Sequence, residues 1–384
     1  MLPDFRLETY FSRWEFRAQF NLAGSDVESM RVDELLALAE PDDLAAWREL
    51  RLGYTETFGS PALRRAIADT YRVIDDDHVL CFAGAQEGIF CATHALLDPS
   101  DHVIVMVPNY QSTEEVPLSI CAVTGVELEP VDGAWRLDLD DIRAAVRPNT
   151  KLISMNFPNN PTGAVIDRAT FDGIIALAAE RGIYVFSDEV YRGLERESDR
   201  MLPNAADVYP RALSLGVMSK SYGLPGLRIG WIACQDTGVL GRLERMKHYT
   251  SICNAGPSEV LATIALHAAD TILERNRSLV RENVGRVTAF MSRHPQLFDW
   301  QAPDGGCIAF PRYLGPEGVD EFCRAAVEES GVLLLPNSVY QSRVSPVPSD
   351  RFRIGFGRRN LPEALAQLDE HLTTHVSAGA AGGR

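Results

Sequence analysis

The sequence predicts an α/β protein with a large domain, built on a mostly parallel seven-stranded sheet flanked by helices, and a smaller α+β domain. In the middle of the chain, short apolar segments alternate with amphipathic segments of helical period. This alternation is typical of a parallel sheet that is covered on both faces. The C-terminal part instead contains longer helical segments and few strands. The predicted strands are residues 78–82, 102–107, 126–130, 152–156, 183–187, 212–216 and 229–233.

Helices are predicted where apolar residues recur with the helical period. Three lie between the strands, and a long helical stretch leads into a C-terminal part with one more helix and one strand. These segments are residues 87–97, 139–146, 168–180, 255–293 and 319–330, with the strand at 352–355. We expect residues 1–40 to join the small domain, 41–285 to form the large domain and 286–384 to form the small domain.

Composition and charge exclude several classes of protein. A hydrophobic content of 46% supports a packed core, and a net charge of -16 leaves no basic surface for nucleic acid or an anionic membrane. No apolar run approaches the ~20 residues that a membrane helix needs. The first 16 residues are too charged for a signal peptide. We therefore expect a cytoplasmic protein that binds neither nucleic acid nor membranes.

The cysteines and histidines do not indicate a disulfide framework or a metal site. Seven cysteines are scattered through the chain without a Cys-x-x-Cys pair, and the eight histidines lack the spacing of metal ligands. An odd, unclustered set of cysteines in a long chain favours reduced thiols. We expect no bound metal.

Polar segments follow four of the predicted strands. In open α/β sheets, ligands bind outside the carboxyl ends of the strands, so these segments are the candidates for a binding site. They are residues 83–86 (AGAQ), 156–163 (NFPNNPTG), 188–191 (DEVY) and 219–220 (SK).

The residue types in these segments meet the requirements of pyridoxal 5′-phosphate. The cofactor needs a lysine amine for its aldehyde, a carboxylate for its pyridine nitrogen and hydrogen-bond donors for its ring oxygen. Its phosphate needs a helix N-terminus and an arginine. The sequence offers a residue for each of these tasks.

The motifs also resemble those of a known family. Residues 218–231 (MSKSYGLPGLRIGW) resemble the lysine signature of fold type I aminotransferases, the aspartate aminotransferase family (class I/II). Residues 160–163 (NPTG) and 188–191 (DEVY) resemble two further motifs of that family. They occur in the family's order and spacing, and the resemblance spans roughly residues 54–353. It implies the fold of pyridoxal-phosphate enzymes of type I.

The resemblance implies a role for each residue that faces the cofactor ring. Lys220 would form the Schiff base and move the proton between the substrate Cα and the cofactor. Asp188 would pair with the pyridine nitrogen, and Tyr191 and Asn160 would hydrogen-bond to the ring oxygen. Tyr110 would stack on the ring.

The resemblance also assigns the phosphate site. Arg228 would bind the phosphate together with backbone N–H groups at the start of a helix. Many relatives carry serine or threonine three residues before the lysine, where this chain has Val217, and Ser219 would substitute in part. Tyr54 would reach the phosphate of a neighbouring subunit, which implies a homodimer with shared active sites. The backbone N–H groups are those of Gly84, Ala85 and Gln86.

The resemblance further implies that Arg353 clamps the substrate α-carboxylate, and we expect Asn160 and Gly24 to contact the substrate as well. In this family an arginine can bind the distal carboxylate of the substrate, but no arginine near residues 247–251 matches it. The sequence therefore does not indicate which substrate side chain is preferred. Trp14 and Glu15 could line the pocket, but a simple helix-face position is favoured for both.

These residues predict a pyridoxal-phosphate-dependent aminotransferase that moves an amino group between an α-amino acid and a 2-oxo acid. Other chemistry on the same site stays open: β/γ-elimination, oxidation, or cyclisation of an arginine derivative as in capreomycidine synthase. A cofactor-binding regulator is disfavoured because no DNA-binding module precedes Met30. A nicotinamide dehydrogenase is disfavoured because no Gly-x-Gly-x-x-Gly follows a strand.

Overall fold

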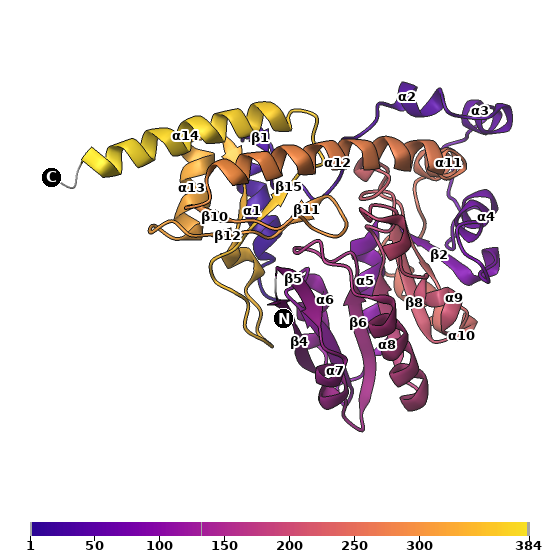
Figure 1. The fold of residues 1–384 in the computed structure, drawn as a ribbon. Coiled ribbons are helices and arrows are strands. Elements are labelled where there is room, and N and C mark those ends of the chain that lie inside the picture. Colours follow the sequence, from indigo (N-terminus) through magenta and orange to yellow (C-terminus); the bar gives the residue numbers. More distant parts are fainter. Residues whose placement is uncertain (1, 132, 382–384) are drawn as a thin grey trace.

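The computed structural model describes residues 2–131 and 133–381, and its ribbon has a large part and a small part (Figure 1). The large part is built on one eight-stranded sheet with the strand order β2-β9-β8-β7-β6-β3-β4-β5. The strands are β2 (Val79–Phe82), β3 (His102–Val107), β4 (Ala122–Val131), β5 (Ala134–Leu137), β6 (Thr150–Asn156), β7 (Tyr184–Asp188), β8 (Ala212–Val217) and β9 (Gly230–Ala233).

All seven predicted strands are present, but the predicted number of strands is wrong by one. The additional strand β5 forms an antiparallel hairpin with β4, in which Val131 pairs with Ala134. No helix follows β4, so the alternation of strands and helices, on which the prediction rested, could not reveal β5. β9 is antiparallel to both of its neighbours, whereas β3, β4, β6, β7 and β8 are parallel, so the sheet is mixed.

The central strands are buried on both faces. Along β3, Val103 and Val105 belong to the apolar cluster that contains α5, whereas Ile104 and Met106 pack in the cluster that contains α8. Successive side chains of a strand point to opposite faces, which explains this division. The surrounding helices are α2 (Val32–Leu36), α3 (Pro41–Arg48), α4 (Pro61–Ala68), α5 (Ala85–Leu96), α6 (Ser112–Leu118), α7 (Leu139–Ala145), α8 (Arg168–Arg181), α9 (Ala205–Val208) and α10 (Thr237–Lys247).

The long helical stretch predicted at 255–293 is two helices, α11 (Gly256–His267) and α12 (Ala269–Arg293). The chain leaves the helical conformation at Ala268, where φ is -95° and ψ is 18°. α12 crosses from the large part to the small part (Figure 1), and residue 285 lies inside it.

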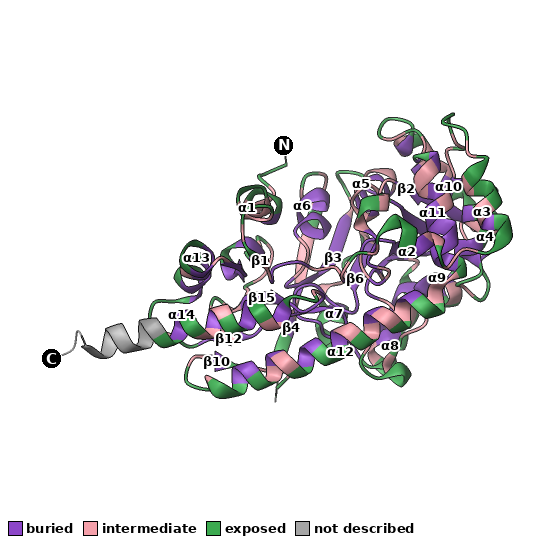
Figure 2. Cartoon of the chain, turned by 90° about the horizontal axis from the view of Figure 1, so that it is seen from above, coloured by how far each residue is buried: buried purple, intermediate pink, exposed green. Residues whose placement is uncertain are grey.

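The small part contains a three-stranded sheet in the order β11-β15-β14. The predicted helix at 319–330 and strand at 352–355 are confirmed as α13 and β15. Seen from above, α12 and α14 lie side by side along this part (Figure 2). Its elements are β10 (Phe298–Asp299), β11 (Ile308–Ala309), β12 (Arg312–Tyr313), α13 (Val319–Ser330), β13 (Val332–Leu333), β14 (Leu335–Pro336), β15 (Phe352–Gly355) and α14 (Leu361–Ala381).

The N-terminal segment packs on the small part. It forms α1 (Arg6–Trp14) and β1 (Phe20–Asn21), and β1 pairs in parallel with β13. After β1 the chain lies against β15, where the Gly355 N–H donates to the Leu22 carbonyl at 2.6 Å. A Cβ atom at Gly355 would lie 2.0 Å from the Gly24 carbonyl oxygen, so only glycine permits this close approach.

Within the described residues, no helix is long and apolar enough to span a lipid bilayer.

We predict that Gly355→Ala lowers the free energy of unfolding by about 1–3 kcal/mol, because the new methyl group would overlap the Gly24 carbonyl. Urea unfolding of the cofactor-free protein measures the change. Gly285→Ala is the matched control, since an added Cβ meets no atom within 4 Å at this exposed position inside α12. Alanine there should instead stabilise the protein by about 0.5–1 kcal/mol. Equal effects of the two substitutions would contradict the packing described.

Candidate active site

The carboxyl ends of six strands, β2, β3, β4, β6, β7 and β8, lie at one edge of the central sheet. β3, β4, β6, β7 and β8 point the same way, and so does β2, because β9 is antiparallel both to β2 and to β8. β9 begins at this edge for the same reason. The segments at this edge carry the predicted residues Gly84, Tyr110, Asn160, Asp188, Lys220 and Arg228.

The chain contains three lysines, and each has a different environment. The buried Lys247 donates hydrogen bonds to the Thr57 carbonyl at 2.5 Å and to the Asn254 side-chain oxygen at 2.8 Å. Lys151 lies near the start of β6, at the opposite edge of the sheet. Lys220 is therefore the one lysine of this chain at the carboxyl edge.

Lys220 is largely enclosed, and its Nζ donates a hydrogen bond to Ser25 Oγ at 2.8 Å. Burial lowers the pKa of its amine, and the positive charge of Arg353 lowers it further, while Asp26 and Asp188 act in the opposite direction. A larger fraction of this amine is neutral near pH 7 than for a lysine in water. A neutral amine can act as a nucleophile and as a base.

Asp188 is the last residue of β7, and its side chain is 5% exposed. Burial raises the pKa of its carboxyl group to about 7, although the Val190 N–H, 3.2 Å from Oδ1, and the charge of Lys220 both favour the ionised form. Burial without a full counter-charge leaves this carboxylate suited to pair with a cation.

Asn160 and Tyr191 lie against the small part. The side-chain oxygen of Asn160 accepts hydrogen bonds from Arg353 at 3.1 Å and from the Tyr340 hydroxyl at 3.4 Å. Tyr191 is 1% exposed, and its buried hydroxyl has no hydrogen-bond partner of ordinary geometry among the described residues. Burial raises the pKa of this hydroxyl, so it stays protonated and can donate.

Arg353 lies on β15 of the small part and is 1% exposed. Besides Asn160, its guanidinium donates to the Ala23 carbonyl at 2.6 Å, while its Nε has no partner within the described part of the chain. A buried guanidinium with a free donor fits a carboxylate ligand.

The predicted phosphate site is a helix N-terminus beside an arginine. Gly84, with φ of 90°, precedes α5, whose first two residues are Ala85 and Gln86. The Arg228 guanidinium lies so close that a Cβ atom at Gly84 would be 2.4 Å from it. Arg228 also lies 3.5 Å from Ser219 Oγ. Backbone N–H groups at the start of a helix and an adjacent guanidinium make an anion site.

The remaining predicted residues, Tyr110, Tyr54 and Gly24, differ in their surroundings. Tyr110 packs against Phe5, with ring centroids 5.2 Å apart, and burial and the charges of Glu8 and Asp188 raise the pKa of its hydroxyl. Tyr54 is 94% exposed. Gly24 is buried, with the Arg358 guanidinium 3.1 Å from where its Cβ would lie.

The structure adds residues that the sequence analysis missed. Ser25 contacts Lys220, and Asp26 forms an ion pair with Arg358 at 2.6 Å. Glu15 directly follows α1 and keeps helical dihedral angles, and burial raises the pKa of its carboxyl group while the charges of Arg358 and Lys220 lower it. Trp14 packs in an apolar cluster of the small part. No local motif marks Ser25 and Asp26, since they reach the site through the packing of residues 22–24 on β15.

The arrangement fits pyridoxal phosphate on observations of this chain alone. The orphaned Tyr191 hydroxyl and the raised pKa of Asp188 provide a donor and an anionic partner for a protonated heterocycle. Because position 84 is glycine, the Arg228 guanidinium can lie close to the backbone there, and a side chain at this position would overlap it. Lys220 supplies the amine. No group of three His, Cys, Asp or Glu side chains that could hold a metal ion occurs in the described residues.

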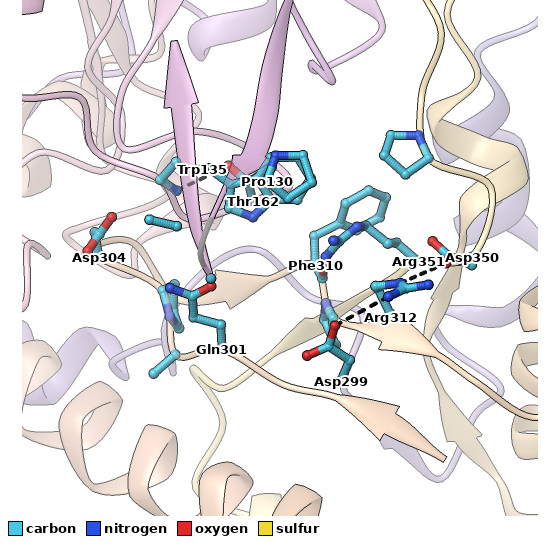
Figure 3. Close-up of a pocket in the computed structure, with 17 residues that line it drawn as sticks. Pro130, Trp135, Thr162, Asp299, Gln301, Asp304, Phe310, Arg312, Asp350 and Arg351 are labelled. Carbon is cyan, nitrogen blue, oxygen red and sulfur yellow. Dashed lines mark hydrogen bonds and ion pairs between the residues drawn. The ribbon is translucent and has the colours of Figure 1, made fainter. Parts of the chain in front are cut away.

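A separate cavity of about 380 Å³ lies between the β4–β5 hairpin and the small part (Figure 3). Figure 3 shows Arg312 between Asp299 and Asp350, with ion pairs of 3.5 and 2.8 Å. None of the predicted site residues lines this cavity, so it is distinct from the site around Lys220.

Comparison with known proteins agrees with this geometry. The profile of the family "Aminotransferase class I and II" matches residues 19–368. The chain is 31% identical to capreomycidine synthase of Streptomyces vinaceus, covering 98% of this chain and 95% of that protein. It is 32% identical to a probable N-succinyldiaminopimelate aminotransferase of Mycobacterium tuberculosis, over 81% of this chain and 82% of that protein.

Among solved structures, a PLP-dependent aminotransferase from Streptococcus suis 89-1591 superposes with a TM-score of 0.89 at 31% identity, covering 97% of this chain and 98% of that one. The predicted fold, an α/β large domain of type I with a smaller domain, is confirmed. Because the family profile spans most of the sequence and the relatives match along most of their length, the chain belongs to the class I and II aminotransferases, a family of pyridoxal-phosphate-dependent transferases.

Proposed function

We propose that this enzyme transfers the amino group of an α-amino acid to a 2-oxo acid, with Lys220 as the cofactor-binding and proton-transferring residue. The observation that carries the proposal is the enclosed, partly neutralised Lys220 amine at the same sheet edge as Asp188. When bound, pyridoxal phosphate supplies an aldehyde that condenses with amines and a ring that withdraws electrons from the substrate Cα.

Lys220 has two tasks in this proposal. Its amine would hold the cofactor, and in the presence of substrate the same amine would move the proton at the substrate Cα. Both tasks need the neutral amine, which the lowered pKa favours. Ser25 accepts a hydrogen bond from Nζ and so orients it.

Asp188, Asn160 and Tyr191 would hold the cofactor ring. Asp188 would keep the pyridine nitrogen protonated, and that positive charge would in turn lower the pKa of the carboxyl group. Tyr191 and Asn160 would donate to the ring oxygen. Tyr110 would cover one face of the ring, and Ser219, with Arg228 and the N–H groups of residues 84–86, would bind the phosphate.

Arg353 would bind the substrate α-carboxylate, with its free Nε and its Nη atoms as donors. Its bond to Asn160 links the carboxylate clamp to the ring-binding residues. This linkage would hold the Cα–H bond within reach of Lys220, and positioning of this kind contributes substantially to catalysis. Gly24, beside the Ala23 carbonyl that holds Arg353, would border the substrate.

We also propose that the enzyme is a cytoplasmic homodimer. Tyr54 is an aromatic residue with 94% of its side chain exposed, and Leu52 nearby is 88% exposed, so this segment offers an apolar surface for a second subunit. Tyr54 of one protomer would then reach the phosphate of the other.

One observation favours a different reaction on the same site, the cyclisation of an arginine derivative. The similarity to capreomycidine synthase covers 98% of this chain. We therefore keep cyclisation of an arginine derivative, and with it elimination or oxidation, as the alternative. The Lys220 site would serve all of these reactions, since fold alone does not choose among them.

The experiment mixes the purified holoenzyme with a panel of amino acids in the absence of any 2-oxo acid. Transamination predicts one 2-oxo acid released per site, with the cofactor recovered as pyridoxamine phosphate. Addition of a 2-oxo acid should then give multiple turnovers, and Lys220→Ala should lower the rate by at least about 10²-fold. Continuous release of ammonia without an acceptor would contradict transamination and favour the alternative.

The pKa of Asp188 predicts a pH dependence of stability in the cofactor-free protein. Between about pH 4 and pH 7 the folded state holds a proton on Asp188 that the unfolded state has lost, so stability decreases as pH rises through this range. The slope from this group is at most about 1.4 kcal/mol per pH unit. The substitution Asp188→Asn removes this contribution to the pH dependence of stability.

Urea unfolding at pH 5 and pH 7 measures this effect. The free energy of unfolding of Asp188→Asn, relative to the wild type, should be larger at pH 7 than at pH 5. A difference that does not change with pH would show that Asp188 is already ionised at pH 5.

A further inference from the structure

Helix α1 covers the site from the small part. The Phe11 ring lies 6.0 Å from the Arg353 guanidinium, and the Phe5 ring lies 5.2 Å from that of Tyr110. The Arg6 N–H donates to the Gln111 side chain at 2.9 Å, which ties α1 to the start of α6. Figure 2 shows α1 beside α6. The helix therefore lies over both the ring-stacking residue and the carboxylate clamp.

The face of α1 that carries Phe11 also carries two glutamates. Glu8 precedes Phe11 by three residues and Glu15 follows it by four, and residues at this spacing lie on one face of a helix. Glu15 keeps helical dihedral angles, with φ of -54° and ψ of -41°, so the same geometry applies to it. Two carboxylates thus flank the residue that contacts Arg353.

Neither glutamate has a partner of opposite charge. No hydrogen bond or ion pair to the side chain of Glu8 or Glu15 is present in the described part of the chain. Burial and the charges of Asp26 and Glu8 raise the pKa of Glu15, while Arg358 and Lys220 lower it. Arg358 already pairs with Asp26 at 2.6 Å, so it does not neutralise the glutamates.

Two buried polar groups of the site, one of them beside Phe11, also lack partners of ordinary geometry within the described residues. The Arg353 Nε and the Tyr191 hydroxyl belong to side chains that are 1% exposed, and neither atom has a hydrogen-bond partner of ordinary geometry among the described residues. Arg353 contacts Phe11 on α1, and Tyr191 interacts with Ser25, which holds Lys220. Buried polar groups are normally hydrogen-bonded, so these two groups, one beside Phe11 of α1 and one beside Ser25, indicate that a ligand binds near them.

We propose that Glu8 and Glu15 select an amino acid whose side chain ends in a cation, a guanidinium or an ammonium group. This inference rests on the proposed function, because the α-carboxylate must bind to Arg353. A helix rises about 6 Å over four residues, which separates Glu15 from Phe11 along α1. An arginine side chain reaches a similar distance from its Cα, about 6 Å over five bonds. An acidic side chain would be repelled at the same place.

Binding of two unreactive ligands tests the charge preference. The compound 5-guanidinopentanoate is arginine without its α-amino group, and 5-ureidopentanoate has nearly the same shape without the positive charge. Titration calorimetry on the holoenzyme should give a Kd at least about tenfold lower for the guanidino compound, since a hydrogen-bonded ion pair contributes about that factor. Equal Kd values, or tighter binding of the neutral compound, would overturn the proposal.

Two variants test whether Glu8 and Glu15 cause the preference for the cationic ligand. Glu15→Gln and Glu8→Gln keep the shape of each side chain, and at least one of them should lower the ratio of the two Kd values by about threefold or more. Glu363→Gln, at an exposed position in the first turn of α14, is the control and should leave the ratio unchanged. If both α1 variants keep the wild-type ratio, the glutamates do not recognise the cation.

The amino-acid panel separates this inference from the proposed function. A holoenzyme that releases a 2-oxo acid from norleucine or glutamate in preference to arginine and lysine would contradict only the charge preference. A holoenzyme that responds to no amino acid would contradict the proposed function and this inference together. A preference for arginine or lysine over citrulline supports both.

Discussion

Burial disfavours the charged forms of both Lys220 and Asp188, and the rest of the site depends on this constraint. The pKa of the lysine amine is lowered and that of the carboxyl group is raised, so each group is closer to neutral than it would be in water. A protonated ring bound beside Asp188 would restore a counter-charge to the carboxylate. The pair therefore suits a cationic heterocycle that places an electrophilic carbon near Lys220.

The sheet and the small part contribute different halves of the site. The alignment of strand ends brings Asp188, Lys220 and the Gly84 loop to one edge, and the antiparallel β9 returns Arg228 to the same edge. The substrate side instead depends on β15 and on the N-terminal segment that packs against it at Gly355. The proposed cofactor site is thus built from local motifs, whereas the proposed substrate site is built from segments far apart in the sequence.

This division explains what the sequence could predict. Lys220, Asp188, Asn160 and Arg228 stand in short motifs at strand ends, so both the fold and the cofactor followed from them. Ser25, Asp26 and Glu15 stand in no motif, and the first two reach the site because residues 22–24 lie against β15. The strand β5 and the break between α11 and α12 were missed for a related reason: a four-residue hairpin strand and a single non-helical residue at Ala268 leave the apolar periodicity almost unchanged.

The central claim is that Lys220 carries the cofactor, and the small number of lysines permits a direct test. Borohydride reduction of the holoenzyme fixes a pyridoxyl group on the lysine that holds it, and peptide mass spectrometry then distinguishes Lys151, Lys220 and Lys247. The structure predicts one modification per chain, on the peptide that contains Lys220. Modification of Lys247 or Lys151 instead, or of no lysine in protein that retains pyridoxal phosphate, would contradict the account.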